Sequence, residues 1–175
     1  LPAHMIPADW IAPKAPRRMD VDPATLAEAV ATIRAAKRPL VVSGRGARGA
    51  GPAIVRFLDA TDALYLDTQE SRGLVPAGHP AVVGAVRAAA MGQADLVITL
   101  GRKLDYQMGF GSPAVFPEAR FLRVSDTTGE LIDNRRGTPE ILAPVDVTLQ
   151  ALTEALGNEA GARDADWLDG LRGKH

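Results

Sequence analysis

A glycine-rich stretch with the spacing G-x-G-x-x-G runs through Gly44-Arg45-Gly46-Ala47-Arg48-Gly49, and Asp67 lies 18 residues after its last glycine. In dinucleotide-binding folds, such glycines expose backbone N–H groups to a pyrophosphate, and an acid about 20 residues later binds the ribose. One hypothesis is therefore a free-standing NAD-binding module that uses Gly44–Gly49 and Asp67. The alternative is an ordinary mobile turn, because Gly51-Pro52 places the helix start after all of these glycines.

A second candidate site follows the apolar run Leu96–Leu100, which ends at Gly101 and leads into Arg102, Lys103 and Asp105. Both faces of that run are apolar, which is typical of a strand covered by helices on both sides. Ligands of open α/β sheets bind at the carboxyl ends of the strands. There a lysine can hold phosphate as a point charge and an arginine as a fork. The alternative is a solvated cationic pair balanced by Asp105.

The chain shows no complete catalytic apparatus. No serine, acid and histidine have the spacing of a triad, and no two histidines or aspartates share a helix face for a metal. His79, in a Gly-His-Pro turn, is more typical of a structural hydrogen bonder than of a base. We therefore predict no catalytic residue and no metal ligand here.

The composition is that of a soluble globular domain, with 46% hydrophobic and 23% charged residues among 175. A net charge of −1 gives no reason to expect nucleic acid or an anionic membrane as a partner. The absence of cysteine excludes disulfides and zinc–thiolate sites, and no apolar run approaches the ~20 residues that span a bilayer. We expect a cytoplasmic protein. Because the chain begins Leu1-Pro2-Ala3, we interpret it as a piece of something longer.

Short strands alternate with helices along the chain, which predicts one three-layer, doubly wound parallel α/β domain. Asp22-Pro23 is a typical helix start, and further helices are expected from Pro52, over Val82–Met91 and over Val147–Leu156. The expected strands are Leu40–Val42, Ala63–Leu66, Leu96–Leu100, Phe121–Val124 and Ile141–Leu142. The proline-rich residues 1–21 read as a linker, 22–157 as the domain and 158–175 as a second linker.

Four segments also match known family motifs in order: Lys37–Gly44 (KRPLVVSG), Arg72–Pro80 (RGLVPAGHP), Ala94–Asp105 (ADLVITLGRKLD) and Phe121–Arg136. Together they resemble the central domain of thiamine-diphosphate-dependent enzymes of the acetolactate synthase, oxalyl-CoA decarboxylase and 2-hydroxyacyl-CoA lyase group. The resemblance covers nearly the whole chain. It implies a Rossmann-like, six-stranded parallel sheet set between two other domains, with residues 158–175 leading toward a cofactor-binding domain.

The same resemblance implies that thiamine diphosphate and Mg²⁺ are bound by the two other domains of a longer parent chain. The parent would be a homo-oligomeric decarboxylase, carboligase or lyase acting on 2-oxo acids or on 2-hydroxyacyl-CoA or oxalyl-CoA, the cofactor acting as electron sink. The present piece, which has no counterpart of the magnesium motif, is expected not to catalyse alone.

Departures from the family motifs favour particular relatives. Only Gly84–Gln93 fills the place of the loop that FAD-binding members carry, which argues against FAD. The tail Leu104–Gly111 is more similar to the CoA-acting members, whose central domain can hold an ADP moiety. Lys103 replaces the family's arginine, and the paired strand-end aspartates become Ser125 and Thr127. The candidate residues for binding ADP or CoA are Gly44, Gly46, Thr68, Gly101, Lys103, Asp105 and Asp126.

Overall fold

The computed structural model describes residues 19–172, so the predicted linker 1–21 lies almost entirely outside the described residues. The helices are α1 (Pro23–Ala35), α2 (Gly51–Thr61), α3 (Arg87–Gln93), α4 (Thr128–Leu131), α5 (Val145–Leu156) and α6 (Ala165–Leu171). The strands are β1 (Pro39–Ser43), β2 (Leu64–Leu66), β3 (Leu96–Leu100), β4 (Arg120–Ser125) and β5 (Glu140–Leu142). Within residues 19–172, no helix is long and apolar enough to cross a membrane. The cytoplasmic location stays a prediction.

The five strands form one parallel sheet in the order β2-β1-β3-β4-β5, which confirms the doubly wound α/β architecture. The prediction of a sixth strand is wrong. In its place beyond β2 there is one isolated bridge between Tyr65 and Val82, with Tyr65 N–H donating to Ala81 and Val83 N–H to Tyr65. Pro80 before this segment has no N–H to donate. The 3₁₀ helix η4 (Gly84–Val86) then turns the chain away, so pairing stops after one residue.

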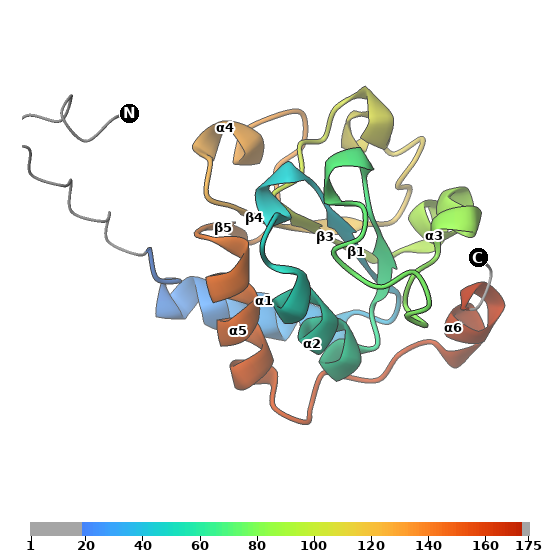
Figure 1. The fold of residues 1–175 in the computed structure, drawn as a ribbon, viewed down its shortest axis with the longest axis horizontal. Helices are drawn as coiled ribbons and strands as arrows, with labels where there is room; N and C mark the ends of the chain where they lie inside the picture. Colours follow the sequence, from blue (N-terminus) through green and yellow to red (C-terminus); the bar gives the residue numbers. More distant parts are fainter. Residues whose placement is uncertain (1–18, 173–175) are drawn as a thin grey trace, which may run out of the picture.

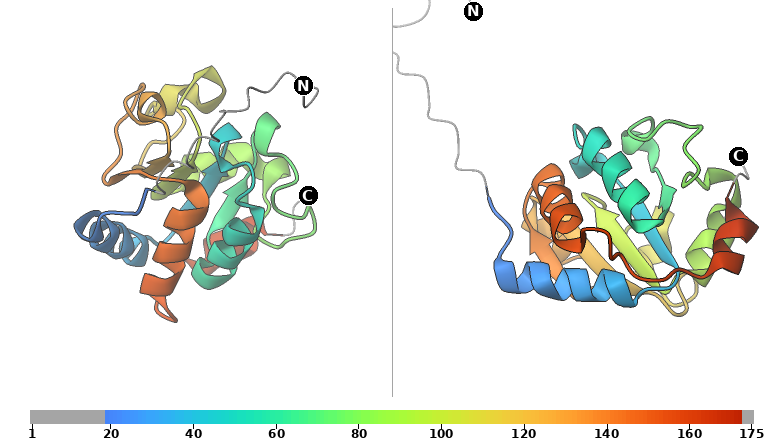
Figure 2. Two further views of the ribbon diagram at one scale, coloured as in Figure 1. Left: turned by 60° about the vertical axis from the view of Figure 1, so that its left-hand side comes forward. Right: turned by 90° about the horizontal axis from the view of Figure 1, so that it is seen from below.

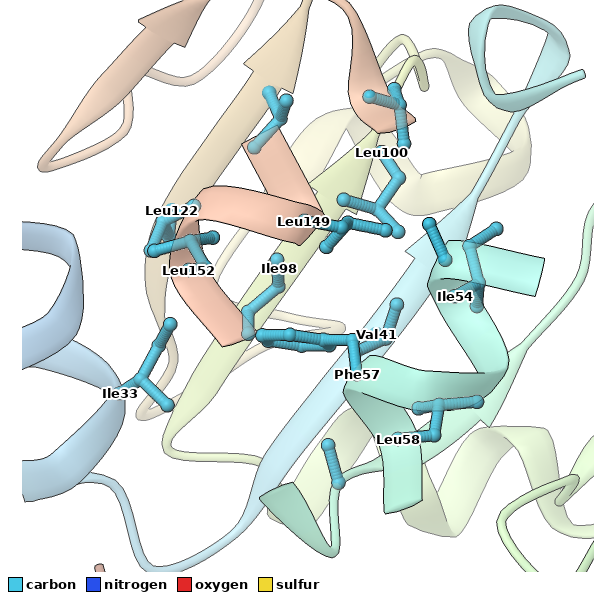
Figure 3. Close-up of a cluster of buried hydrophobic side chains, with 14 of the residues drawn as sticks. Ile33, Val41, Ile54, Phe57, Leu58, Ile98, Leu100, Leu122, Leu149 and Leu152 are labelled. Carbon is cyan, nitrogen blue, oxygen red and sulfur yellow. The ribbon is translucent and has the colours of Figure 1, made fainter. Parts of the chain in front are cut away.

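Helices α1, α2 and α5 cover one face of the sheet (Figures 1 and 2). Figure 3 shows side chains of α2 and α5, among them Phe57 and Leu149, converging over β1 and β3. The 3.6-residue period places them on one side of each helix, so the core cluster includes Ile54, Phe57, Leu58, Leu149 and Leu152. At the start of α1, the side chain of Asp22 accepts the N–H of Thr25, as predicted for a helix cap.

Helices α3 and α6 and the loop that follows β3 cover the opposite face (Figure 2). Its cluster contains Leu40, Val42 and Val97 from the strands together with Trp167 and Leu168 from α6. Every residue of β1 and β3 is buried, and successive side chains point to opposite faces. The apolar run Leu96–Leu100, which predicted a strand covered on both faces, is therefore confirmed.

Residues 158–172 are packed onto the domain. Arg163 donates to the carbonyls of Thr61 and Ala36 at 2.8 and 2.7 Å, at the ends of α2 and α1. The N–H of Asp164 donates to Lys37 O at 3.0 Å, immediately before α6 begins. Whether this segment also leads toward another domain stays a prediction.

Replacing Arg163 by alanine should lower the free energy of unfolding by about 1–2 kcal/mol, because the cation satisfies carbonyls at two helix C-termini. The measurement is urea denaturation followed by circular dichroism. Arg172→Ala is the matched control, since that arginine forms an exposed pair with Asp62 and should cost under about 1 kcal/mol. Equal losses in the two variants would contradict a capping role for Arg163.

Candidate functional site

A pocket of about 480 Å³ is lined by residues of the turns that follow β1, β2, β3 and β4. These turns all lie at the carboxyl edge of the sheet. The pocket spans the point between β1 and β3 from which the chain winds in both directions, the usual ligand position in such sheets. Its lining comprises Arg45, Thr68, Gln69, Glu70, Gly101, Arg102, Lys103, Asp105, Tyr106, Gln107, Thr127, Gly129 and Glu130. The predicted location of the site therefore has a pocket.

The glycines after β1 pack against the turn after β3. A Cβ on Gly101, whose φ is +51°, would lie 2.4 Å from Gly46 Cα, and one on Gly44 would lie 2.5 Å from Gly101 O. The N–H of Gly44 donates to Leu100 O at 2.9 Å, and that of Gly46 donates to Gly101 O at 3.0 Å. These glycines thus allow two backbone turns to touch, and their N–H groups are already used.

Arg102 and Asp105 form a closed ion pair on the pocket wall. Two guanidinium nitrogens donate to the two carboxylate oxygens at 2.9 Å each, and one also donates to Gln107 Oε1 at 2.9 Å. Burial by itself would raise the pKa of Asp105, but hydrogen bonding and charge from Arg102 and the N–H groups of Gln107 and Met108 outweigh it and lower that pKa. Asp105 is therefore a neutralised structural carboxylate.

Two cations in the same pocket have no such partner. Lys103 is exposed beside the Arg102–Asp105 pair, and Arg45 is exposed on the turn after β1. Among residues 19–172, neither side chain forms an ion pair or a hydrogen bond with another residue of the chain. The pocket therefore presents two positive charges that are available to a ligand. They lie at the edge of the sheet where the sequence predicted that a phosphate group could bind.

A carboxylate of α4, that of Glu130, also lines the pocket. Glu130 accepts a hydrogen bond from Ser125 Oγ at 2.8 Å, and Ser125 Oγ also accepts the N–H of Thr127 at 3.1 Å. This arrangement fixes the end of β4, where the resemblance led us to consider Asp126. The side chain of Asp126 is exposed and lines a different hollow.

Arg123 on β4 is completely buried and holds the α4 turn in place. Its guanidinium pairs with the carboxylate of Asp133 and donates to the carbonyls of Glu130, Leu131 and Arg135. Asp133 in turn accepts the N–H of Leu104 at 2.6 Å. This one buried cation therefore connects two walls of the pocket, the turn after β3 and the turn after β4.

A buried network of hydroxyl groups fixes the wall after β2. Ser43 Oγ lies 2.6 Å from Tyr65 Oη and donates to Ser71 Oγ at 2.9 Å, and burial raises the pKa of Tyr65. The Thr68 hydroxyl donates to Ser43 O at 2.7 Å. Thr68 lines the pocket, but its hydroxyl hydrogen is already used in this hydrogen bond.

The seven predicted residues are not all brought together. Thr68, Gly101, Lys103 and Asp105 line the pocket, whereas Gly46 and Asp126 line a separate hollow of about 240 Å³. Gly44 lines neither of them and is buried against the turn after β3. Asp67 lies in an adjoining hollow of about 330 Å³ that shares Thr68, Gln69 and Gln107 with the pocket. Whether any of these residues binds a ligand stays a prediction.

Sequence reasoning missed Arg45, Glu130 and Arg123. Arg45 was visible only as a variable position inside the glycine motif, and Glu130 only as part of a family segment. Arg123 carried a usable signal, a charge in the middle of an apolar strand. Within residues 19–172, no group of three or more His, Cys, Asp or Glu side chains could hold a metal ion.

Comparisons with known proteins agree with this fold. Residues 26–152 match the family model described as "Thiamine pyrophosphate enzyme, central domain". The chain is 29% identical over 151 residues to mouse 2-hydroxyacyl-CoA lyase 1, which covers 83% of this chain and 26% of the mouse protein. It is 31% identical over 131 residues to human 2-hydroxyacyl-CoA lyase 1, which covers 73% of this chain and 23% of the human protein. It thus spans about a quarter of these relatives.

A solved structure shows the same architecture. Benzoylformate decarboxylase from Polynucleobacter necessarius superposes with a TM-score of 0.70 at 18% identity, over 91% of this chain and 33% of that one. Such a likeness supports the fold alone, whereas the family model matches well over half of the present sequence. The chain therefore belongs to the thiamine pyrophosphate enzymes and forms their central domain.

Proposed function

We propose that the chain works as the central domain of a longer thiamine-diphosphate-dependent lyase, decarboxylase or carboligase. Its substrates would be 2-oxo acids or the CoA thioesters of 2-hydroxy acids or oxalate. The family assignment supports this, as do relatives named 2-hydroxyacyl-CoA lyase and oxalyl-CoA decarboxylase. The described residues offer no carboxylate cluster suited to Mg²⁺. In keeping with the family assignment, we place thiamine diphosphate and Mg²⁺ on two other domains of a homo-oligomeric parent.

The test of this part uses the full-length parent protein. It should bind thiamine diphosphate only when Mg²⁺ is present, and it should cleave a 2-hydroxyacyl-CoA or decarboxylate a 2-oxo acid or oxalyl-CoA. The 175-residue chain by itself should do neither. A parent that neither binds the cofactor nor turns over any of these substrates would end the proposal.

We further propose that the pocket at the carboxyl edge of the sheet binds the ADP portion shared by free ADP and CoA. The observation that carries this is the pair of available cations, Lys103 and Arg45, beside a carboxylate that Arg102 already neutralises. Phosphate groups are the anions that such a constellation suits. NAD is not part of the proposal, because it was suggested by the glycine motif alone, and the N–H groups of Gly44 and Gly46 already donate to the turn after β3. FAD is not part of it, because only Gly84–Gln93 fills the place of the loop that FAD-binding members carry.

Replacing Lys103 by alanine should weaken ADP binding to the 175-residue chain about tenfold or more, because one charge-assisted contact to phosphate is lost. Isothermal titration calorimetry at a fixed, low salt concentration measures the effect. Lys37→Ala is the matched control, since Lys37 is exposed immediately before β1, at the opposite edge of the sheet. Equal dissociation constants for the two variants would place the nucleotide elsewhere.

A further inference from the structure

Phe110 combines two features that are each unfavourable in a domain standing alone. Its φ is +54°, in the left-handed region that bulky side chains rarely adopt, and the residue is 52% exposed. Such backbone conformations persist only where the surrounding structure enforces them, and they gather at functional positions. A second aromatic residue of the same turn, Tyr106, is 73% exposed. The turn η5 (Tyr106–Gly111) therefore presents two aromatic side chains outward.

Hydrogen bonds and packing fix the η5 turn in this conformation. Phe110 N–H donates to Asp105 O at 2.8 Å, and Arg135 donates to Gly111 O at 2.6 Å. Between the two aromatic residues, the side chain of Met108 is fully buried in the core. The aromatic pair therefore stands on a preorganised support, which lowers the entropy cost of binding a partner.

The exposed pair is suited to another protein surface rather than to a small molecule. Tyr106 lines the pocket of about 480 Å³, but Phe110 lines none of the hollows described above. The Tyr106 hydroxyl accepts a hydrogen bond from Gln107 Nε2 at 3.5 Å, and no residue from 19 to 172 uses its hydrogen. A fitting partner surface is therefore apolar and offers Tyr106 an acceptor.

We propose that Tyr106 and Phe110 dock against another domain of the same parent chain. The inference rests on the proposed function, which makes this chain one domain of a longer protein. The chain spans 26% of its mouse relative and 23% of its human relative, so most of a parent of that size lies outside it.

The size of the patch favours a domain of the same chain over a second copy. Burying a Tyr or Phe side chain removes about 150–250 Å² from water, so four such rings in a symmetric pair would supply about 600–1,000 Å². A specific interface between separate proteins needs about 1,200–2,000 Å². Domains of one chain need less, because the linker between them keeps their effective concentration high.

Hydroxyl-radical footprinting with mass spectrometry tests the contact, because the oxidation rate of a side chain reports its accessibility. The rates of Tyr106 and Phe110 should fall several-fold from the 175-residue chain to the full-length parent, since an interface core excludes water. Leu142, 45% exposed on the outer strand β5, is the internal control and should keep its rate. Unchanged rates at both aromatic residues would overturn the proposal.

Tyr106→Ser tests whether the contact contributes to stability. In the 175-residue chain it should shift the midpoint of thermal unfolding by no more than about 2 °C, because exposed substitutions are nearly neutral. In the parent it should lower the midpoint by about 4 °C or more, the effect of losing an interface anchor. Ile132→Ser is the matched control, since Ile132 is 59% exposed outside η5, and it should shift both proteins equally little. Equal shifts for Tyr106→Ser in the two proteins would contradict docking.

Sedimentation velocity distinguishes a second copy from another domain. The 175-residue chain should be monomeric, and a dimer that Tyr106→Ser dissociates would overturn the proposal in favour of self-association. Cofactor binding and turnover are measured separately on the same parent. A parent that lacks both refutes the proposed function, whereas a parent that has them but leaves Tyr106 and Phe110 exposed refutes the docking surface alone.

Discussion

Replacing Arg123 by methionine is expected to lower the free energy of unfolding by about 3–5 kcal/mol, the loss typical of breaking a buried ion pair from one side. Arg123 is completely buried, and the side chain of its partner Asp133 is only 8% exposed. Methionine fills much of the volume but leaves Asp133 as a buried charge without its cation. It also leaves the carbonyls of Glu130 and Leu131 without their donor. Urea denaturation followed by circular dichroism measures the loss.

Two controls show whether the loss of stability comes from leaving a buried charge unpaired or simply from removing an arginine. Arg120→Met lies on the same strand at an exposed position and should change stability by less than about 0.5 kcal/mol. Asp133→Asn combined with Arg123→Met should cost less than the sum of the two single changes, because the uncompensated charge is gone. A loss in Arg123→Met no greater than in Arg120→Met would show that the ion pair contributes little.

The second large effect is expected at Gly101. Its φ of +51° lies in the left-handed region, where a side chain costs about 1–2 kcal/mol. A Cβ there would also lie 2.4 Å from Gly46 Cα, a backbone atom that cannot rotate away. Forced displacement of packed structure adds about 1–3 kcal/mol. Gly101→Ala should therefore lose about 3 kcal/mol, measured by the same denaturation experiment.

Two other glycines serve as matched comparisons. Gly49 has a φ of +88° but open space around its Cα, so Gly49→Ala should show only the backbone cost, about 1–2 kcal/mol. Gly129 has open space and no positive φ, so Gly129→Ala should be nearly neutral. If Gly101→Ala lost no more than Gly49→Ala, contact between the two turns would not be what requires glycine.

Local patterns were enough to predict much of the fold. The Asp22 cap lies where expected, and the apolar run Leu96–Leu100 forms the central strand of a sheet covered on both faces. The number of strands was taken from a resemblance, and there the chain differs, because the segment around Val82 pairs with β2 through one residue. Pairing at a sheet edge depends on the turns that flank it, which the family pattern does not specify.

The sequence by itself determined the order of strands and helices and the edge of the sheet that carries the pocket. These follow from apolar periodicity and from the rule that parallel strands end at one edge, both of which are read from neighbouring residues. Only the tertiary structure decided what each residue does there. Gly46 contacts Gly101, and Arg123 pairs with Asp133. The carboxylate of Asp105 is neutralised by Arg102, whereas one oxygen of Glu130 has no partner among residues 19–172. The reason is physical: whether a charge or an N–H group is available depends on partners that packing brings together, and periodicity along the chain does not encode those partners.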